Sequence, residues 1–259
     1  MGRSPPSPTT CWDCTDGYRH GLMRLVVREG KPMNLVARSL AVVAVAAAIA
    51  VPAQEFRERK DYFKLPVPVE TRDPDKIEVV EVFSYGCIHC YQLEPILNAW
   101  VLAQGDDVDF HRVPMATRNL RTLAQAFYTA KELDVLAKVH MPMFENIHDY
   151  GIDMSRPQMI RRMFETQAGV DEEEFARMFD SFAIATRVRQ ADAQTRLYRV
   201  QGTPTIIVNG RYLVDTVSAG SAEGMLLVVN HLLAKERAER EVQAAQGGVG
   251  EQAPTSPTG

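Results

Sequence analysis

The stretch FSYGCIHCYQLEP, residues 83–95, carries two cysteines with two residues between them. It follows Ile77–Phe83 (IEVVEVF), a β-branched run about as long as a buried strand. The apolar residues after the cysteines recur at helical spacing up to Gly105: Leu93, Leu97, Trp100 and Val101. The pair therefore lies where a strand passes into a helix, with Cys87 at the helix N-terminus.

Cysteine use in the whole chain leaves two interpretations of this pair open. The 259 residues are 46% hydrophobic and 24% charged, an ordinary globular composition, and include four cysteines. These form two C-x-x-C pairs, Cys11/Cys14 and Cys87/Cys90, which fit either one four-thiolate zinc site or two separate redox pairs. The segment between the pairs decides between these interpretations.

That segment has the pattern of a secretory signal peptide. It begins at Met33 with Arg38 in a short polar lead, continues through an apolar run over 40–51 and ends in small residues. As a helix this run would reach roughly 18 Å, less than the roughly 30 Å of bilayer hydrocarbon, which disfavours a permanent membrane span. We predict a signal peptide at residues 33–53, cleaved after Ala53 or, alternatively, after Ala50.

Residues 1–32 form a mixed-charge, Pro/Ser-rich preamble that is unusual before a signal peptide, so we interpret them as an over-extended start and place the true start at Met33. Cleavage would remove Cys11 and Cys14 and with them the zinc alternative. Cys87 and Cys90 would remain as the single cysteine pair of an exported chain, in a compartment that tolerates disulfides. A pair kept alone favours a chemical role, with no metal ion.

The rest of the chain predicts an interrupted α/β domain. A second strand at 108–115 closes a β-α-β unit, which implies a parallel pair. Residues 117–199 show helical patterns only, and strands return at 205–208 and 212–214 around the hairpin signal Asn209-Gly210. We therefore assign 54–116 and 200–243 to one domain with a last helix at about 221–241, 117–199 to an all-α insertion, and 244–259 to a disordered tail.

Charge patterning argues against a nucleic acid partner. The chain carries 29 Lys and Arg residues against 33 Asp and Glu residues, a net charge of -4. No long basic run is present that could follow a phosphate backbone.

The position of the two cysteines predicts unequal chemistry. Cys87 faces the positive end of the helix dipole and free backbone N–H groups, which favour its thiolate, and His89 adds a hydrogen-bond donor and a possible positive charge. Cys90 lies one turn further along the helix, where it can close a disulfide with Cys87. A stable Cys87 thiolate stabilises the reduced pair, so the disulfide is readily passed to a substrate.

Two further positions are candidates for the same site. Glu81 lies in the apolar strand six residues before Cys87, where a buried carboxylate is costly unless it has a task, and we interpret it as a proton acceptor for Cys90. Glu78 should point to the opposite side of the strand, so we expect one of the two glutamates to face inward. Pro204, in QGTPT at 201–205, suggests a turn or a cis peptide at the start of the late hairpin.

These motifs together resemble the DsbA family of periplasmic thiol:disulfide oxidoreductases within the thioredoxin superfamily. The resemblance covers roughly residues 60–240 and depends on FSYGCIHCYQLEP, on Pro95 five residues after the second cysteine, and on VQGTPTIIVNGRY at 200–212. One departure is Ile88-His89 between the cysteines, where the familiar DsbA dipeptide is Pro-His. That dipeptide tunes the redox potential, so the departure bears on oxidant strength and leaves thiol exchange unaffected.

The resemblance implies a thioredoxin fold with an inserted helical domain, and it implies a role for each site residue. Cys87 would be the exposed nucleophile, Cys90 its buried partner, Glu81 the buried acid, and Thr203-Pro204 a cis peptide that binds the substrate backbone. No cofactor is implied beyond the Cys87–Cys90 disulfide. The implied protein is a periplasmic monomer that oxidises reduced exported proteins and is itself re-oxidised by a membrane thiol oxidase of the DsbB type.

Two alternatives to an oxidase remain at this point. A disulfide isomerase or reductase is one, although no N-terminal dimerisation domain precedes the thioredoxin-like part after the signal. A thioredoxin-like chaperone that binds extended peptides near Pro204 without turnover is the other, and the presence of both cysteines argues against it.

Overall fold

The computed structural model describes residues 55–117 and 119–247. The predicted signal peptide, the early start and Cys11/Cys14 lie outside these residues. The described elements are β1 (Phe63–Lys64), β2 (Ile77–Phe83), α2 (Ile88–Leu102), β3 (Val108–Pro114), α3 (Arg121–Glu132), α4 (Leu136–His148), α5 (Pro157–Ala168), α6 (Glu172–Phe179), α7 (Phe182–Leu197), β4 (Thr205–Val208), β5 (Tyr212–Asp215), α8 (Thr216–Ala219) and α9 (Ala222–Gly247).

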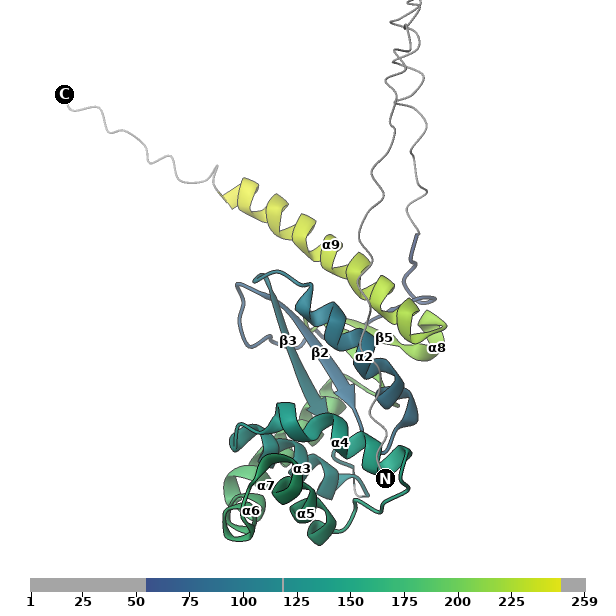
Figure 1. Ribbon diagram of the computed structural model, residues 1–259. Coiled ribbons are helices and arrows are strands. Elements are labelled where there is room, and N and C mark those ends of the chain that lie inside the picture. The colour runs from purple at the N-terminus through teal and green to yellow at the C-terminus, as the bar shows by residue number, and fades with distance from the viewer. Residues whose placement is uncertain (1–54, 118, 248–259) are drawn as a thin grey trace, which may run out of the picture. The chain divides into compact units, whose positions relative to one another are not determined.

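One mixed sheet forms the centre of the described chain, with strand order β1-β5-β4-β2-β3 (Figure 1). β2 pairs with β3 in parallel, as the β-α-β pattern predicts, and with β4 in antiparallel. β4 and β5 form the predicted hairpin, whose turn residues Asn209 and Gly210 have φ of 50° and 60°. A side chain at Gly210 would collide with the carbonyl oxygen of Val69, so this turn requires glycine.

Helices cover both faces of the sheet (Figure 1). On one face, Ile77 and Val79 of β2 pack in a core with α2 and α9. On the other face, Val80 and Val82 join a second core built with helices α3–α7, which lie between β3 and β4 in the sequence. The predicted α/β thioredoxin fold with an all-α insertion is confirmed, and β2 is buried along its whole length.

Three expectations differ from the structure. Glu78 and Glu81 are both buried, whereas the sequence predicts that only one of them faces inward. The two side chains point to opposite faces of β2, and helices cover both of these faces. Helix α9 extends to Gly247, past its predicted end near Glu241 and into the predicted tail. The two-residue strand β1 was not predicted, because it is defined only by its pairing with β5.

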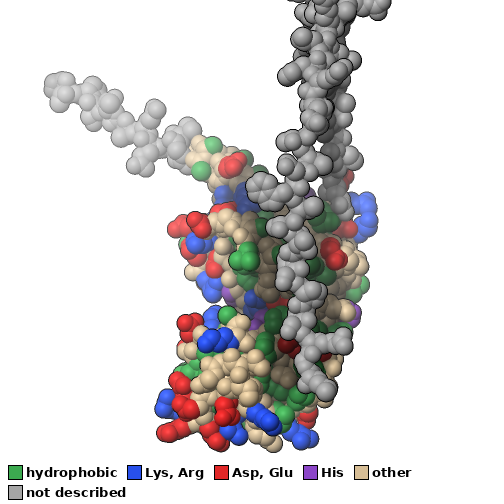
Figure 2. All heavy atoms as spheres, viewed as in Figure 1, with side chains coloured by type: hydrophobic (Ala, Val, Ile, Leu, Met, Phe, Trp, Pro, Cys, Tyr) green, Lys and Arg blue, Asp and Glu red, His purple; other side chains and the backbone are tan. Residues whose placement is uncertain are grey.

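The apolar length of the helices and the distribution of surface charge both bear on function. Within the described residues, no helix is both long and apolar enough to cross a membrane. On the face shown in Figure 2, basic and acidic side chains are interspersed over the described part of the chain.

Candidate active site

The two cysteines occupy the first turn of α2. Cys87 is the N-cap residue and is partly exposed, whereas Cys90 is completely buried, and both are free thiols. The N-cap position places Cys87 at the positive end of the helix dipole, as expected from the sequence. One sulfur is therefore accessible to another protein and the other is not.

The environment drives the two thiol pKa values apart. The pKa of Cys87 falls from 9.0 to about 4, chiefly because the Cys90 thiol donates a hydrogen bond to its sulfur. Burial raises this pKa, but less strongly. Hydrogen bonds from the Thr203 side chain and from the backbone amides of Cys90 and His89 lower the pKa further. The pKa of Cys90 is raised far above its usual range, first by burial and then by the hydrogen bond to Cys87. Cys87 is thus a thiolate at neutral pH and Cys90 a thiol.

His89 supplies Cys87 with a hydrogen-bond donor through its backbone. Its backbone N–H is the part of the residue that lowers the Cys87 pKa, and its imidazole lies exposed to solvent. The ring lines a surface pocket of about 360 Å³ together with Thr216 and Val217.

The Thr203-Pro204 peptide is cis and lies beside the cysteines. Cys87 Sγ lies 3.2 Å from the Thr203 carbonyl oxygen, to which it donates a hydrogen bond in its thiol form. These residues meet because β4 starts directly after Pro204 and pairs with β2, with Thr205 opposite Val82. The sheet thus brings together two motifs that the sequence separates by more than a hundred residues.

A groove continues from the cis peptide across the surface. A pocket of about 330 Å³ is lined by residues on both sides of Pro204 and by the start of α8. Two apolar side chains near the cysteines remain in water: Ile88, 42% exposed, and Val217, 91% exposed. Apolar surface beside a reactive sulfur suits the binding of an unfolded segment.

Below the cysteines, Glu81 belongs to a buried charge cluster. Arg112 of β3 lies opposite Glu81 in the register and donates to it at 2.9 Å. The same guanidinium donates to Glu94 of α2 at 2.9 and 3.2 Å and to Asn98 at 2.8 Å. Glu81 Oε1 has no hydrogen-bond partner among the described residues, so one oxygen of this carboxyl is free to carry a proton.

The two carboxyl groups of this cluster titrate in opposite directions. Burial and then the charge of Glu94 raise the pKa of Glu81 from 4.5 to about 8, against the opposing effect of Arg112. Burial raises the pKa of Glu94, but hydrogen bonds from His140 and Arg112, together with the charge of Arg112, outweigh burial and lower that pKa. Glu81 therefore holds a proton at neutral pH while Glu94 is ionised.

The sequence itself carries signals for Glu94 and Arg112. Glu94 directly follows Leu93 and precedes Leu97 by three residues, so it falls on the apolar stripe of its helix, where a carboxylate needs a partner. Arg112 is the one cation in the predicted strand 108–115. A parallel β-α-β register would have placed it near Glu81.

A possible metal site lies elsewhere on the sheet. Ligand atoms of Glu78, Asp109 and His111 are within 4.8 Å of one another. The guanidinium of Arg72 already donates to both oxygens of Asp109, at 2.6 to 3.2 Å, and supplies positive charge there. This group of residues is therefore a poor candidate for a cation.

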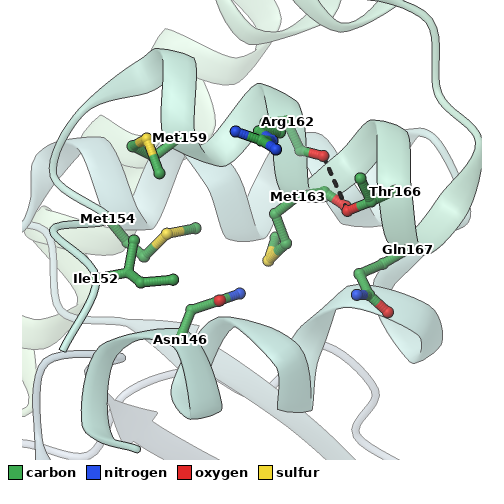
Figure 3. Close-up of a pocket in the computed structure, with 8 residues that line it drawn as sticks. All are labelled: Asn146, Ile152, Met154, Met159, Arg162, Met163, Thr166 and Gln167. Carbon is green, nitrogen blue, oxygen red and sulfur yellow. Dashed lines mark hydrogen bonds between the residues drawn. The ribbon is translucent and has the colours of Figure 1, made fainter. Parts of the chain in front are cut away.

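Figure 3 shows a further pocket, of about 200 Å³, inside the helical insertion between α4 and α5. Three methionines, Met154, Met159 and Met163, line it with polar neighbours. It shares no lining residue with the groove beside the cis peptide. Its lining residues include no thiol or carboxyl group.

Comparison with known proteins agrees with this geometry. The family model of the DSBA-like thioredoxin domain matches residues 78–224. Thiol:disulfide interchange protein DsbA of Azotobacter vinelandii is 37% identical over 179 residues, which cover 69% of this chain and 83% of the relative. The corresponding protein of Pseudomonas aeruginosa is 36% identical over 206 residues, or 79% of this chain and 97% of the relative.

A solved structure extends the similarity to three dimensions. The crystal structure of Pseudomonas aeruginosa DsbA matches with a TM-score of 0.69 and 36% identity, covering 72% of this chain and 97% of that one. The family match, the relatives and the fold thus agree with a pair of thiols whose pKa values are shifted in opposite directions. This chain belongs to the DsbA family of thiol:disulfide oxidoreductases.

Proposed function

We propose that the Cys87–Cys90 disulfide is the redox-active group that the protein donates to reduced cysteines of exported proteins. The observation that supports this most strongly is the contrast between the two sulfurs, a partly exposed thiolate at Cys87 and a buried thiol at Cys90. A thiolate as stable as that of Cys87 is a good leaving group, so a disulfide through Cys87 is readily given up.

The reaction proceeds in two exchange steps. A substrate thiolate attacks the Cys87 sulfur, a substrate–Cys87 disulfide forms, and the Cys87–Cys90 bond breaks with its electron pair on Cys90. A second substrate thiolate then attacks the substrate sulfur of the mixed disulfide, and Cys87 leaves as a thiolate. The substrate loses two electrons and gains a disulfide, and the enzyme is left reduced.

Glu81 supplies the proton for the first step. Cys90 leaves as a thiolate in a buried site where its charge is strongly disfavoured. Glu81 is protonated at neutral pH, and it lies close enough to Cys90 that its ionised form would raise the Cys90 pKa. Proton transfer from the Glu81 carboxyl to the Cys90 sulfur removes the buried charge, and the same carboxylate accepts this proton when the pair is re-oxidised.

The cis peptide and the neighbouring groove position the substrate. The Thr203 carbonyl oxygen lies 3.2 Å from Cys87 Sγ and receives no proton from it when Cys87 is a thiolate or part of a disulfide, so the backbone there can pair with an extended substrate segment. The exposed ring of His89 and the apolar side chains of Ile88 and Val217 contact the substrate on either side of Cys87. These contacts depend little on substrate sequence, as an oxidase of many proteins requires.

The proposal for the cellular context is supported by the signal-peptide pattern at residues 33–53 and by the family of the chain. After signal-peptide cleavage the protein works in the periplasm as a monomer, and a membrane thiol oxidase of the DsbB type restores its disulfide. An isomerase or a non-catalytic peptide-binding chaperone is less well supported, because the pKa of Cys87 favours giving up the disulfide.

The direct test is a disulfide-transfer assay. The exported protein, residue 54 onward, should oxidise a reduced two-cysteine peptide stoichiometrically when it carries its own disulfide. Its equilibrium with a glutathione buffer should lie toward the reduced enzyme, because the Cys87 thiolate is stabilised. An equilibrium that lies toward the oxidised enzyme would indicate a reductase and contradict the proposal.

We further predict that the reduced protein is more stable than the oxidised protein, and that the difference grows with pH. In the reduced folded state Cys87 is ionised above about pH 4, whereas in the unfolded chain it stays protonated up to its ordinary pKa of 9.0. The reduced form therefore gains stability as pH rises through this window and loses it as pH falls, by on the order of 2–4 kcal/mol at pH 7 after solvent screening. The oxidised form has no thiol to titrate.

Urea unfolding of both redox forms at several pH values measures this difference. Glu81 is present in both forms, so its own titration largely cancels when the two are compared. Equal stabilities at neutral pH would show that the Cys87 thiolate is not stabilised by folding.

A further inference from the structure

His140 joins the helical insertion to the buried charge cluster. It lies on α4, is 7% exposed, and places its Nε2 3.0 Å from Glu94 Oε1 and its Nδ1 2.7 Å from the hydroxyl of Tyr85. Four aromatic rings, of Phe83, Tyr85, Phe127 and Phe144, pack against its ring with centroid distances of 5.2 to 6.2 Å. The imidazole is thus held in one orientation.

The hydrogen bonds determine which ring nitrogen carries the proton. Glu94 is ionised and only accepts hydrogen bonds, so His140 Nε2 must donate to it. The other nitrogen then accepts from the Tyr85 hydroxyl, whose pKa is raised by burial so that it keeps its proton. Burial also lowers the pKa of His140, so the ring is neutral at neutral pH. In this tautomer both ring nitrogens of His140 and the hydroxyl of Tyr85 have hydrogen-bond partners.

The two glutamates differ in how many donors they face. Glu94 accepts from Arg112 through two nitrogens, from Asn98 at 3.0 Å and from His140. Glu81 accepts from Arg112 alone among the described residues. The single proton that the pair holds at neutral pH therefore resides on Glu81, and His140 is one source of this asymmetry.

We propose that His140 is a positioning residue for disulfide exchange: by donating from Nε2 it keeps Glu94 as the ionised member of the pair and leaves the transferable proton on Glu81. The inference rests on the proposed function, in which Glu81 exchanges that proton with Cys90. It gives the helical insertion a direct part in the chemistry at the cysteines, in addition to its packing on the sheet.

The test compares two substitutions at this position. His140→Leu removes the donor, whereas the side-chain amide of His140→Gln can place a donor close to the position of Nε2. Carboxyl carbon NMR of the oxidised protein should show Glu94 titrating about 1–2 pH units higher in His140→Leu and Glu81 titrating lower, the shift expected for loss of one charge-assisted hydrogen bond. His140→Gln should restore both midpoints and the wild-type pH profile of exchange.

Charges from every neighbouring element enter this titration. Glu94 faces Arg112 of β3, Glu81 of β2 and His140 of α4. Glu81 also senses Cys87, and this is why the measurement uses the oxidised protein, in which no thiolate is present. Tyr85→Phe, which leaves the Nε2 donor in place, should shift the midpoints less than His140→Leu.

The outcomes separate this inference from the proposed function. Unchanged midpoints in His140→Leu would overturn the positioning role, even in an active enzyme. Shifted midpoints in a chain without oxidase activity would support the role and overturn the proposed function. If His140→Leu does not fold, nitrogen NMR of the wild-type ring still decides, because an Nδ1–H tautomer or a charged ring at neutral pH would contradict the inference.

Discussion

Replacing Cys87 by serine should abolish disulfide transfer to substrates. A serine hydroxyl cannot form a disulfide, and Cys90 is then the one cysteine left among the described residues. Cys90 is 0% exposed and its pKa is raised far above the usual range, so a substrate thiolate cannot reach it and it does not ionise. Single-turnover oxidation of a reduced peptide should therefore fall to the uncatalysed rate.

Substitutions of Cys90 provide the matched controls. Cys90→Ser keeps the accessible sulfur, so this variant should form a mixed disulfide at Cys87 with oxidised glutathione. Because the largest cause of the low Cys87 pKa is the hydrogen bond from Cys90, Cys90→Ala should raise that pKa, while serine, which still donates, should raise it less. Turnover by Cys87→Ser would show that another group receives the substrate thiolate.

Replacing Arg112 by methionine should cause a large loss of stability. Arg112 is 14% exposed in its side chain and contacts Glu81 and Glu94, whose side chains are 0% exposed. Methionine keeps much of the volume but leaves two buried carboxyl groups without a cation, which typically costs about 3–5 kcal/mol. The free energy of unfolding, measured with urea, should fall by this amount at neutral pH.

The loss should depend on pH in a defined direction. Glu94 has a lowered pKa in the folded protein, so its contribution is present at neutral pH and is lost as the pH falls through the folded value. Without Arg112 both carboxyl groups take up protons more readily, so the difference between variant and wild type should shrink toward about pH 5 and grow toward about pH 8. A constant difference would mean that lost packing, and not lost charge, causes the effect.

Two controls separate a buried ion pair from an exposed one. Arg112→Lys keeps the charge but cannot contact both glutamates with one planar group, so it should be intermediate. Arg237→Met removes an ion pair with Asp107 of similar distance, 2.6 Å, in which the side chains are 42% and 45% exposed. Because such surface pairs contribute about 0–1 kcal/mol, this variant should remain close to wild type.

The sequence predicts those strands and turns that are determined by residues close together in the chain. β2 and β4 match their predicted bounds because both are apolar β-branched runs that end at turn-forming residues. Gly169, which follows α5, adopts a left-handed conformation with φ of 73°, and the Asp171 side chain accepts from the backbone N–H of Glu174 three residues later. These features depend on residues close together in the sequence.

Features that depend on residues far apart in the sequence are not predicted from it. The burial of Glu78 depends on helices that arrive later in the chain, and β1 depends on a partner strand about 150 residues further on. At the site, the sequence indicated Cys87, Cys90 and Glu81, but not the Arg112 and His140 side chains that surround Glu94. Such contacts are fixed by tertiary packing, which a single sequence does not display directly.

The pairing of β2 with β4 has a consequence for the order in which the chain matures. β2 is an interior strand of the sheet, yet its neighbour β4 begins only at Thr205, after the whole helical insertion. During synthesis from the N-terminus, the cysteines emerge long before the strand that carries Thr203 and Pro204 beside them. Contacts of such high sequence separation form late, so both thiols of the nascent chain are exposed at first. The difference between the pKa values of Cys87 and Cys90 is complete only once nearly the entire polypeptide has been made.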